Sequence, residues 1–74
     1  MIVIIGEKAY KADQKIAEEL LKIASDSIPF GIYALKKGDK LEMRRDKCKS
    51  MAELKRLTRH FKSNGYKVYS NKGD

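Results

Sequence analysis

The sequence FGIYALKKGDKLEMRR, residues 30–45, predicts a β-hairpin. Residues 30–36 and residues 40–45 have the composition of two strands, and the KGD between them is typical of a tight turn. In the second strand Leu41 and Met43 alternate with charged side chains. Because successive side chains of a strand point to opposite faces, one face of this hairpin is expected to be buried and the other exposed.

On the N-terminal side of the hairpin, the sequence predicts one strand and one helix. MIVII, residues 1–5, is rich in β-branched side chains and is typical of a strand that is buried on both faces. Residues 12–25 carry apolar side chains at helical spacing, with charged side chains elsewhere, which predicts an amphipathic helix. Pro29 ends this segment, because proline lacks an amide hydrogen and disfavours the helical conformation of the preceding residue.

On the C-terminal side of the hairpin, the sequence predicts a second helix and a last strand. SMAE, residues 50–53, matches a capping box, in which serine and glutamate side chains accept hydrogen bonds from free amides at a helix start. The helix is expected to end at Asn64 and Gly65, because glycine tolerates the left-handed conformation found at that position. Residues 66–70 predict a short strand, and residues 71–74 are expected to be a frayed end.

The predicted elements follow in the order β-α-β-β-α-β, which makes the chain an α+β protein. Short connections and right-handed crossovers favour a ferredoxin-like fold, a four-stranded antiparallel sheet in the order 4-1-3-2 with both helices on one face. This order places the apolar first strand inside the sheet. A chain of 74 residues has room for one modest core, so residues 1–74 are expected to form a single domain.

The composition excludes several classes of protein. The chain has one cysteine and can form no internal disulfide, so the sequence predicts an intracellular, cytoplasmic protein. Neither a metal-ligand cluster nor a phosphate-cradling glycine loop is present in the sequence, and we expect no metal or other cofactor. Cys48 and His60 lack the neighbouring groups that would make them a nucleophile or a base, so no enzymatic activity is expected.

Positive charge is concentrated in the second half of the chain. The net charge is +7; residues 1–37 contribute +1 (six Lys, five Asp or Glu), and residues 38–74 contribute +6 (eleven Lys or Arg, five Asp or Glu). Such asymmetry within one domain indicates a face that meets an anionic partner. The predicted phosphate contacts are Arg44, Arg45, Lys55, Arg56, Arg59 and Lys62.

With both helices on one face, the other face of the predicted sheet would be bare. It would combine apolar side chains of the first strand with tyrosines and lysines of its neighbours. Tyrosine rings on such a surface stack on unpaired bases, so Tyr33 and Tyr69 are the predicted stacking groups. The same apolar centre also suits contact with a second copy of the chain, and the sequence therefore predicts a homodimer.

Two hypotheses of function follow from the basic face. The first is a non-enzymatic, nucleic-acid-binding regulator that acts as a homodimer, with RNA or single-stranded DNA preferred over duplex. The alternative is a small inhibitor or adaptor, of a viral or mobile-element type, whose basic face docks on an acidic surface of a partner protein. No membrane partner is expected, because no bulky apolar row is left for lipid once the stripe of the second helix is in the core.

Overall fold

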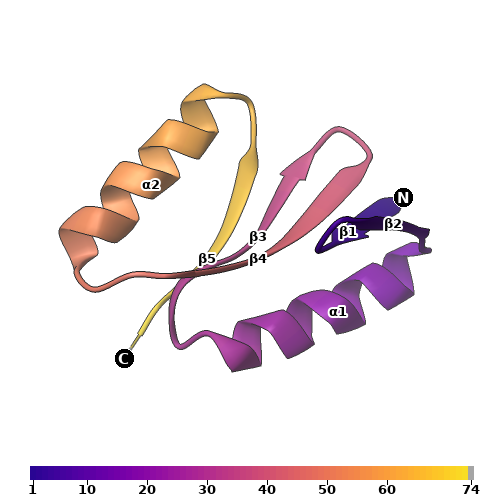
Figure 1. The fold of residues 1–74 in the computed structure, drawn as a ribbon, viewed down its shortest axis with the longest axis horizontal. Helices are drawn as coiled ribbons and strands as arrows, with labels where there is room; N and C mark the ends of the chain where they lie inside the picture. Colours follow the sequence, from indigo (N-terminus) through magenta and orange to yellow (C-terminus); the bar gives the residue numbers. More distant parts are fainter. Residues whose placement is uncertain (74) are drawn as a thin grey trace.

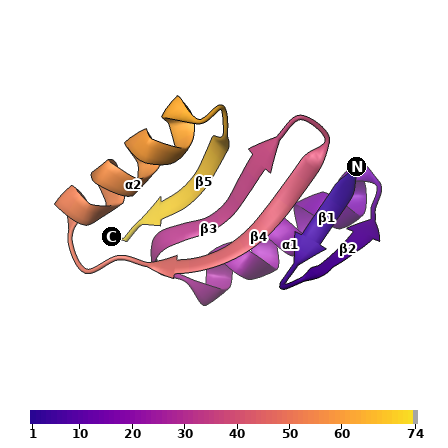
Figure 2. The same ribbon diagram turned by 45° about the horizontal axis from the view of Figure 1, so that its top comes forward.

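The chain forms five strands and two helices in a computed structural model that describes residues 1–73 (Figure 1). The elements follow in the order β1 (Ile2–Ile5), β2 (Lys8–Lys11), α1 (Gln14–Ser27), β3 (Phe30–Lys37), β4 (Lys40–Lys47), α2 (Met51–Ser63) and β5 (Lys67–Lys72). The strands make one mixed sheet in the order β2-β1-β4-β3-β5, with β2 and β5 at its two edges (Figure 2). The pair β1 and β4 is parallel, and the other three pairs are antiparallel. The protein is therefore a single α+β domain.

The central hairpin and both helices are confirmed, within two residues of their predicted ends. The side chain of Asp13 caps α1 by accepting a hydrogen bond from the amide of Ile16 at 2.8 Å. The hairpin of β3 and β4 runs up to the turn at Gly38, whose φ of +60° is a left-handed conformation that favours glycine. Local sequence signals thus account for where these elements begin and end.

Strand β2 is the element that the sequence analysis missed. After β1 the chain turns at Gly6, which has a φ of +63°, and returns as Lys8–Lys11 to pair with β1 in antiparallel register. In the ferredoxin-like order the last strand would occupy this position beside β1. Because β2 already fills it, β5 pairs with the free side of β3 instead. The predicted ferredoxin-like strand order is therefore wrong.

The two helices lie on opposite faces of the sheet (Figure 1). From the pairing directions, β2 and β3 point one way, and β4 and β5 point the other way. α1 joins β2 to β3 and α2 joins β4 to β5, and both connections advance across the sheet toward β5. Right-handed connections that advance together between strands of opposite direction place their helices on opposite faces. The prediction that both helices cover one face is thus wrong.

Each helix encloses its own part of the core. On the face covered by α1, which we call the α1 face, Ala17 packs with Val3, Ala34 and Leu41. On the opposite face, the α2 face, Leu54 packs with the β3 residues Ile32 and Leu35, and other partly buried side chains of α2 and β5 surround them. Two small cores separated by the sheet replace the single core that was expected.

A bulge in β3 divides its side chains between the two faces. The register with β4 and with β5 shifts between Ile32 and Ala34. As a result Ile32 and Leu35 reach the α2 core, while Tyr33 and Ala34 lie on the α1 face. Just before the bulge, the position of a Cβ on Gly31 would collide with the carbonyl oxygen of Asp46, and φ of Gly31 is +149°. Only glycine allows β3 and β4 to approach so closely here.

Strand β5 continues beyond its predicted end. It extends to Lys72, so Asn71 and Lys72 are part of the sheet and not a frayed end; residue 74 lies outside the described residues. The side-chain amide of Asn71 donates hydrogen bonds to the backbone carbonyl oxygens of Ser25 and Ile28, at 2.8 and 2.9 Å. These bonds tie β5 to the C-terminal end of α1. Between residues 1 and 73, neither helix is long and apolar enough to cross a membrane.

Candidate nucleic-acid interface

Helix α2 carries most of the predicted phosphate contacts and is capped at both ends. The hydroxyl of Ser50 accepts a hydrogen bond from the amide of Glu53 at 3.2 Å, as the capping box predicts. At the other end the side-chain amide of Asn64 donates to the carbonyl oxygen of His60 at 2.8 Å, and Gly65 has a φ of +86°. The inward side of α2 packs on the α2 core, so the outward side chains of the helix are held on a rigid support.

A groove of about 740 Å³ runs between α2 and the edge strand β5. We call it the basic groove, because four of its lining side chains are cationic and, within residues 1–73, no carboxylate lines it. Its floor is apolar and includes Leu54 and Val68. The remaining lining side chains include three hydroxyls. The full lining set is Met51, Leu54, Lys55, Thr58, Arg59, Lys62, Ser63, Val68, Ser70 and Lys72.

The structure brings together three of the predicted contacts in this groove. Lys55, Arg59 and Lys62 lie at i, i+4 and i+7 on α2, and all three are exposed. Across residues 1–73, ion pairs join the N-terminal amine to Asp39, and Arg44 to Glu42 and Asp46. No ion pair of that set involves the groove, so its positive charge is available to an external anion.

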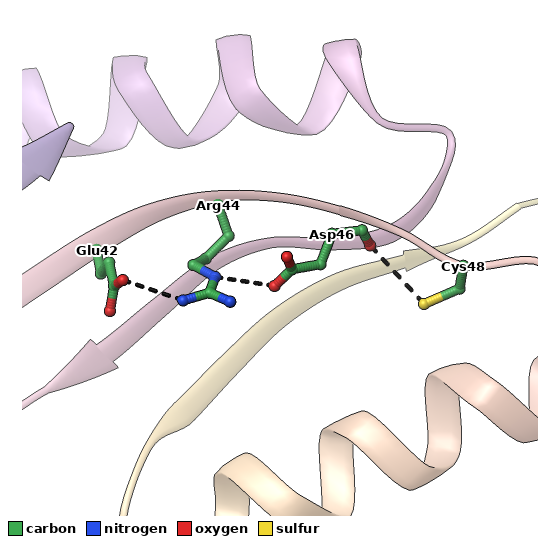
Figure 3. Close-up of polar contacts among 4 residues, drawn as sticks. All are labelled: Glu42, Arg44, Asp46 and Cys48. Carbon is green, nitrogen blue, oxygen red and sulfur yellow. Dashed lines mark hydrogen bonds and ion pairs between the residues drawn. The ribbon is translucent and has the colours of Figure 1, made fainter. Parts of the chain in front are cut away.

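Arg44 is neutralised by its own strand (Figure 3). Its guanidinium lies 2.8 Å from a carboxylate oxygen of Asp46 and 3.1 Å from one of Glu42. The hydrogen bond to Asp46 is the main cause that raises the pKa of Arg44, and burial partly opposes it. The side chain also lies over the ring of Phe61, at 5.4 Å from the centroid. These contacts give Arg44 a structural role that holds β4 against α2.

Arg45 and Arg56 lie outside the basic groove. Arg45 follows Arg44 in β4 and points to the α1 face, where it lines a hollow with Ile23 and Met43. Arg56 is exposed on α2 but does not line the groove, because it belongs to the next row of the helix. The six predicted phosphate contacts are thus divided among four environments.

The predicted stacking groups face away from the basic groove. Tyr33 and Tyr69 are neighbours on β3 and β5, with ring centroids 6.1 Å apart and planes inclined at 48°. Both are half-buried against the α1 core, whereas the groove lies on the α2 face. The ammonium group of Lys67 lies 5.2 Å from the centroid of the Tyr69 ring. Tyr33 and Tyr69 therefore form a separate aromatic pair and do not line the basic groove.

Sequence reasoning missed the contribution of β5 to the groove. Lys72 supplies the fourth cation, and Ser70 a hydroxyl, from alternate positions of this strand. The alternation of Val68, Ser70 and Lys72 was visible in the sequence, but the predicted strand ended at residue 70. Thr58 lies on α2 between Lys55 and Arg59 in the same groove and was overlooked because it carries no charge.

Cys48 lies just after the end of β4 and packs beside the α2 core. Cys48 is half-buried and its thiol donates to the carbonyl oxygen of Asp46 at 3.7 Å. Burial raises the pKa of this thiol, and the charges of Glu53 and Asp46 add to the effect. The lysines on either side of Cys48 in the sequence therefore do not lower the pKa of its thiol. Among the described residues, no group of three or more His, Cys, Asp and Glu side chains could hold a metal ion.

Comparisons of the chain with protein-family models, with curated proteins and with solved structures found no match. The residues that line the basic groove are therefore the basis for a functional proposal.

Proposed function

We propose that the protein is a non-enzymatic regulator that binds single-stranded nucleic acid, RNA or DNA, in the basic groove. The observation that carries the proposal is the grouping of four cations, Lys55, Arg59, Lys62 and Lys72, in a groove that no carboxylate of the described residues lines. The phosphate backbone of a nucleic acid can lie along a groove that is lined with cations. When these cations neutralise the phosphates, counterions are released from the nucleic acid, which favours binding. Arg59 adds directional binding, because its planar guanidinium can donate two parallel hydrogen bonds to one phosphate.

The uncharged lining of the groove supports a single strand as the ligand. Thr58, Ser63 and Ser70 provide hydroxyls, a common donor type to phosphate and sugar oxygens. Leu54 and Val68 form an apolar floor that suits the faces of sugars and unpaired bases. The groove is concave, whereas recognition of a B-form duplex places a helix or a β-ribbon of the protein into a groove of the DNA. An extended strand therefore fits the shape better than a duplex.

The groove is suited to binding and not to chemistry on the bound strand. In the part of the chain that the structure describes, no His, Cys, Asp or Glu side chain lines it. The hydroxyls of the groove thus have no imidazole or carboxylate of the described residues beside them to activate them as nucleophiles. We infer that the protein acts by covering the nucleic-acid strand to which it binds.

The first test measures binding of a fluorescently labelled oligonucleotide by anisotropy at several salt concentrations. We expect the logarithm of the association constant to fall with the logarithm of salt concentration with a slope of about −3, as expected for four phosphates of a single strand. The double variant Lys55→Glu with Arg59→Glu should bind the oligonucleotide at least about tenfold more weakly than the natural protein at low salt.

A matched control changes the same charge elsewhere. Lys11 and Lys40 are exposed and flank Ile2 in the sheet, far from β5. We expect the pair Lys11→Glu and Lys40→Glu to bind within about twofold of the natural protein at physiological salt, where charges separated by more than a Debye length of about 8 Å are screened. Equal losses in the two double variants would mean that net charge alone drives binding. The absence of binding to single strands at low salt would overturn the proposal and favour an acidic protein as the partner.

A further inference from the structure

Exposed apolar side chains gather on one side of α1. In the described part of the chain five large hydrophobic side chains are strongly exposed, and four of them belong to α1 or to the hairpin of β1 and β2. Their exposed fractions are 45% for Ile5, 49% for Tyr10, 47% for Ile16 and 66% for Ile23. A cluster of this kind on a small domain is a typical contact surface for another protein.

The positions of these side chains show that they form one surface. Tyr10 pairs with Val3 across the β1–β2 hairpin, so it lies on the same face as the α1 core, as does Ile5 two residues further along β1. Ile16 and Ile23 lie on one stripe of α1 with the half-buried Leu20 between them. Ile5, Leu20 and Ile23 also line a common hollow of about 530 Å³. We call this surface the α1 patch; it comprises Ile5, Tyr10, Ile16, Leu20 and Ile23.

A row of alternating charges borders the stripe on α1. Four exposed side chains follow one another along the helix with spacings of four, three and four residues, and their signs alternate from positive to negative. This row consists of Lys15, Glu19, Lys22 and Asp26. A uniformly acidic or basic partner would meet as much repulsion as attraction along it. The same row running in the opposite direction is complementary, because each cation then faces an acid.

We propose that the α1 patch is covered by a second copy of the chain, in a two-fold dimer with the two α1 helices antiparallel. In this arrangement Lys15 approaches Asp26 of the second copy, and Lys22 approaches Glu19 of the second copy. A two-fold axis repeats each contact, so the surface is self-complementary. A standard interface of about 800 Å² per partner takes about one seventh of the 5435 Å² of accessible surface.

Pairing of two β2 edges would not give an equally good dimer. An antiparallel contact of one β2 with another in the register that pairs every residue places Lys8 opposite Lys11 of the second copy. Like charges directly opposite in a sheet are destabilising. The helical contact has no such conflict, and it leaves the basic grooves on the opposite faces open. The dimer therefore presents two basic grooves.

The oligomeric state tests this proposal. Light scattering coupled to gel filtration should give a mass of twice 8.5 kDa at high micromolar concentration. Ile23→Glu should give the monomer mass with an unchanged circular dichroism spectrum, because this side chain is 66% exposed in the single chain. Met51→Glu is the matched control, since Met51 is 39% exposed on α2, and it should remain dimeric.

A charge exchange tests the antiparallel arrangement without changing the apolar contacts. Lys22→Glu should weaken the dimer about tenfold, because it sets an acid against Glu19 in both symmetric contacts. The double variant Glu19→Lys with Lys22→Glu should restore the dimerisation constant to within about twofold, because each pair is re-formed with its signs exchanged. A monomer mass at the highest concentration, or a dimer unaffected by Ile23→Glu, would overturn the proposal. A double variant as weak as Lys22→Glu would overturn the antiparallel arrangement.

Discussion

Arg44 and Arg59 show how neighbours decide what an arginine does. Both lie in the basic half of the chain, and both are predicted phosphate contacts. Arg44 is held by two carboxylates of its own strand, whereas Arg59 lines a groove that receives no carboxylate from residues 1–73. Glu42 and Asp46 stand two residues before and after Arg44, and side chains at this spacing in a strand share a face. This pairing could have been predicted from the sequence, because it depends only on the period of the strand.

At this scale we predict that Arg44→Ala changes stability and leaves binding intact. The side chain of Arg44 is about one-third exposed, so solvent screens its ion pairs. The loss of these pairs and of the Phe61 contact should cost about 1 kcal/mol. Urea denaturation should show this loss, while anisotropy with a single-stranded oligonucleotide should stay within about twofold of the natural protein. A loss of affinity as large as that of Arg59→Ala would place Arg44 in the interface.

The helices and the central hairpin could be predicted because their signals are local. Capping at Asp13 and Ser50, the stop at Gly65 and the turn at Gly38 each act within a few residues. Strand β2 could not be predicted in this way. All four of its residues are exposed, so it has no alternation of buried and exposed positions that would mark it as a strand. Its pairing with β1 depends on the turn at Gly6, and a single glycine after an apolar run does not by itself distinguish a hairpin turn from the end of a strand.

At the scale of elements we predict that Asn71 anchors β5 to α1. Asn71→Ala leaves the carbonyl oxygens of Ser25 and Ile28 without these hydrogen bonds and should cost about 2 kcal/mol, or about 10 °C in melting temperature. Asn64→Ala is the control, since it removes one exposed hydrogen bond to His60 and should cost well under 1 kcal/mol. Equal melting temperatures for the two variants would contradict the anchoring role.

The arrangement of the whole molecule follows from the missed strand. Once β2 occupies the side of β1, the position of β5 and the opposite placement of α2 follow from strand direction and crossover handedness. The prediction of the site was limited by the same missed strand. Three groove cations were predicted together because they share one helix, but the separation of Tyr33 and Tyr69 from them depends on which face α2 covers.

At the scale of the whole molecule we predict two levels of stability. The α2 core, built around Ile32, Leu35 and Leu54, and the strands that carry it lie within residues 30–72, whereas the α1 core joins Val3 to residues distant in sequence. Bringing Val3 into contact with distant residues of β3 and β4 closes a long stretch of chain, which costs conformational entropy. The N-terminal part should therefore open first. Native-state hydrogen exchange should show weaker protection of amides in β1, β2 and α1 than in β3 and α2. Equal protection throughout would indicate one cooperative unit.

Strand β2 has a consequence for the behaviour of the chain at high concentration. The segment IVII of β1 is short, apolar, uncharged and β-branched, which is the composition of segments that stack into amyloid-like sheets. In the folded protein both edges of this segment are paired, one with β4 and the other with β2. The edge that faces solvent belongs instead to β2, whose Lys8 and Lys11 act as gatekeepers against further strand addition. A four-residue strand that contributes nothing to the buried core thus keeps the most aggregation-prone part of the sequence out of reach of other chains.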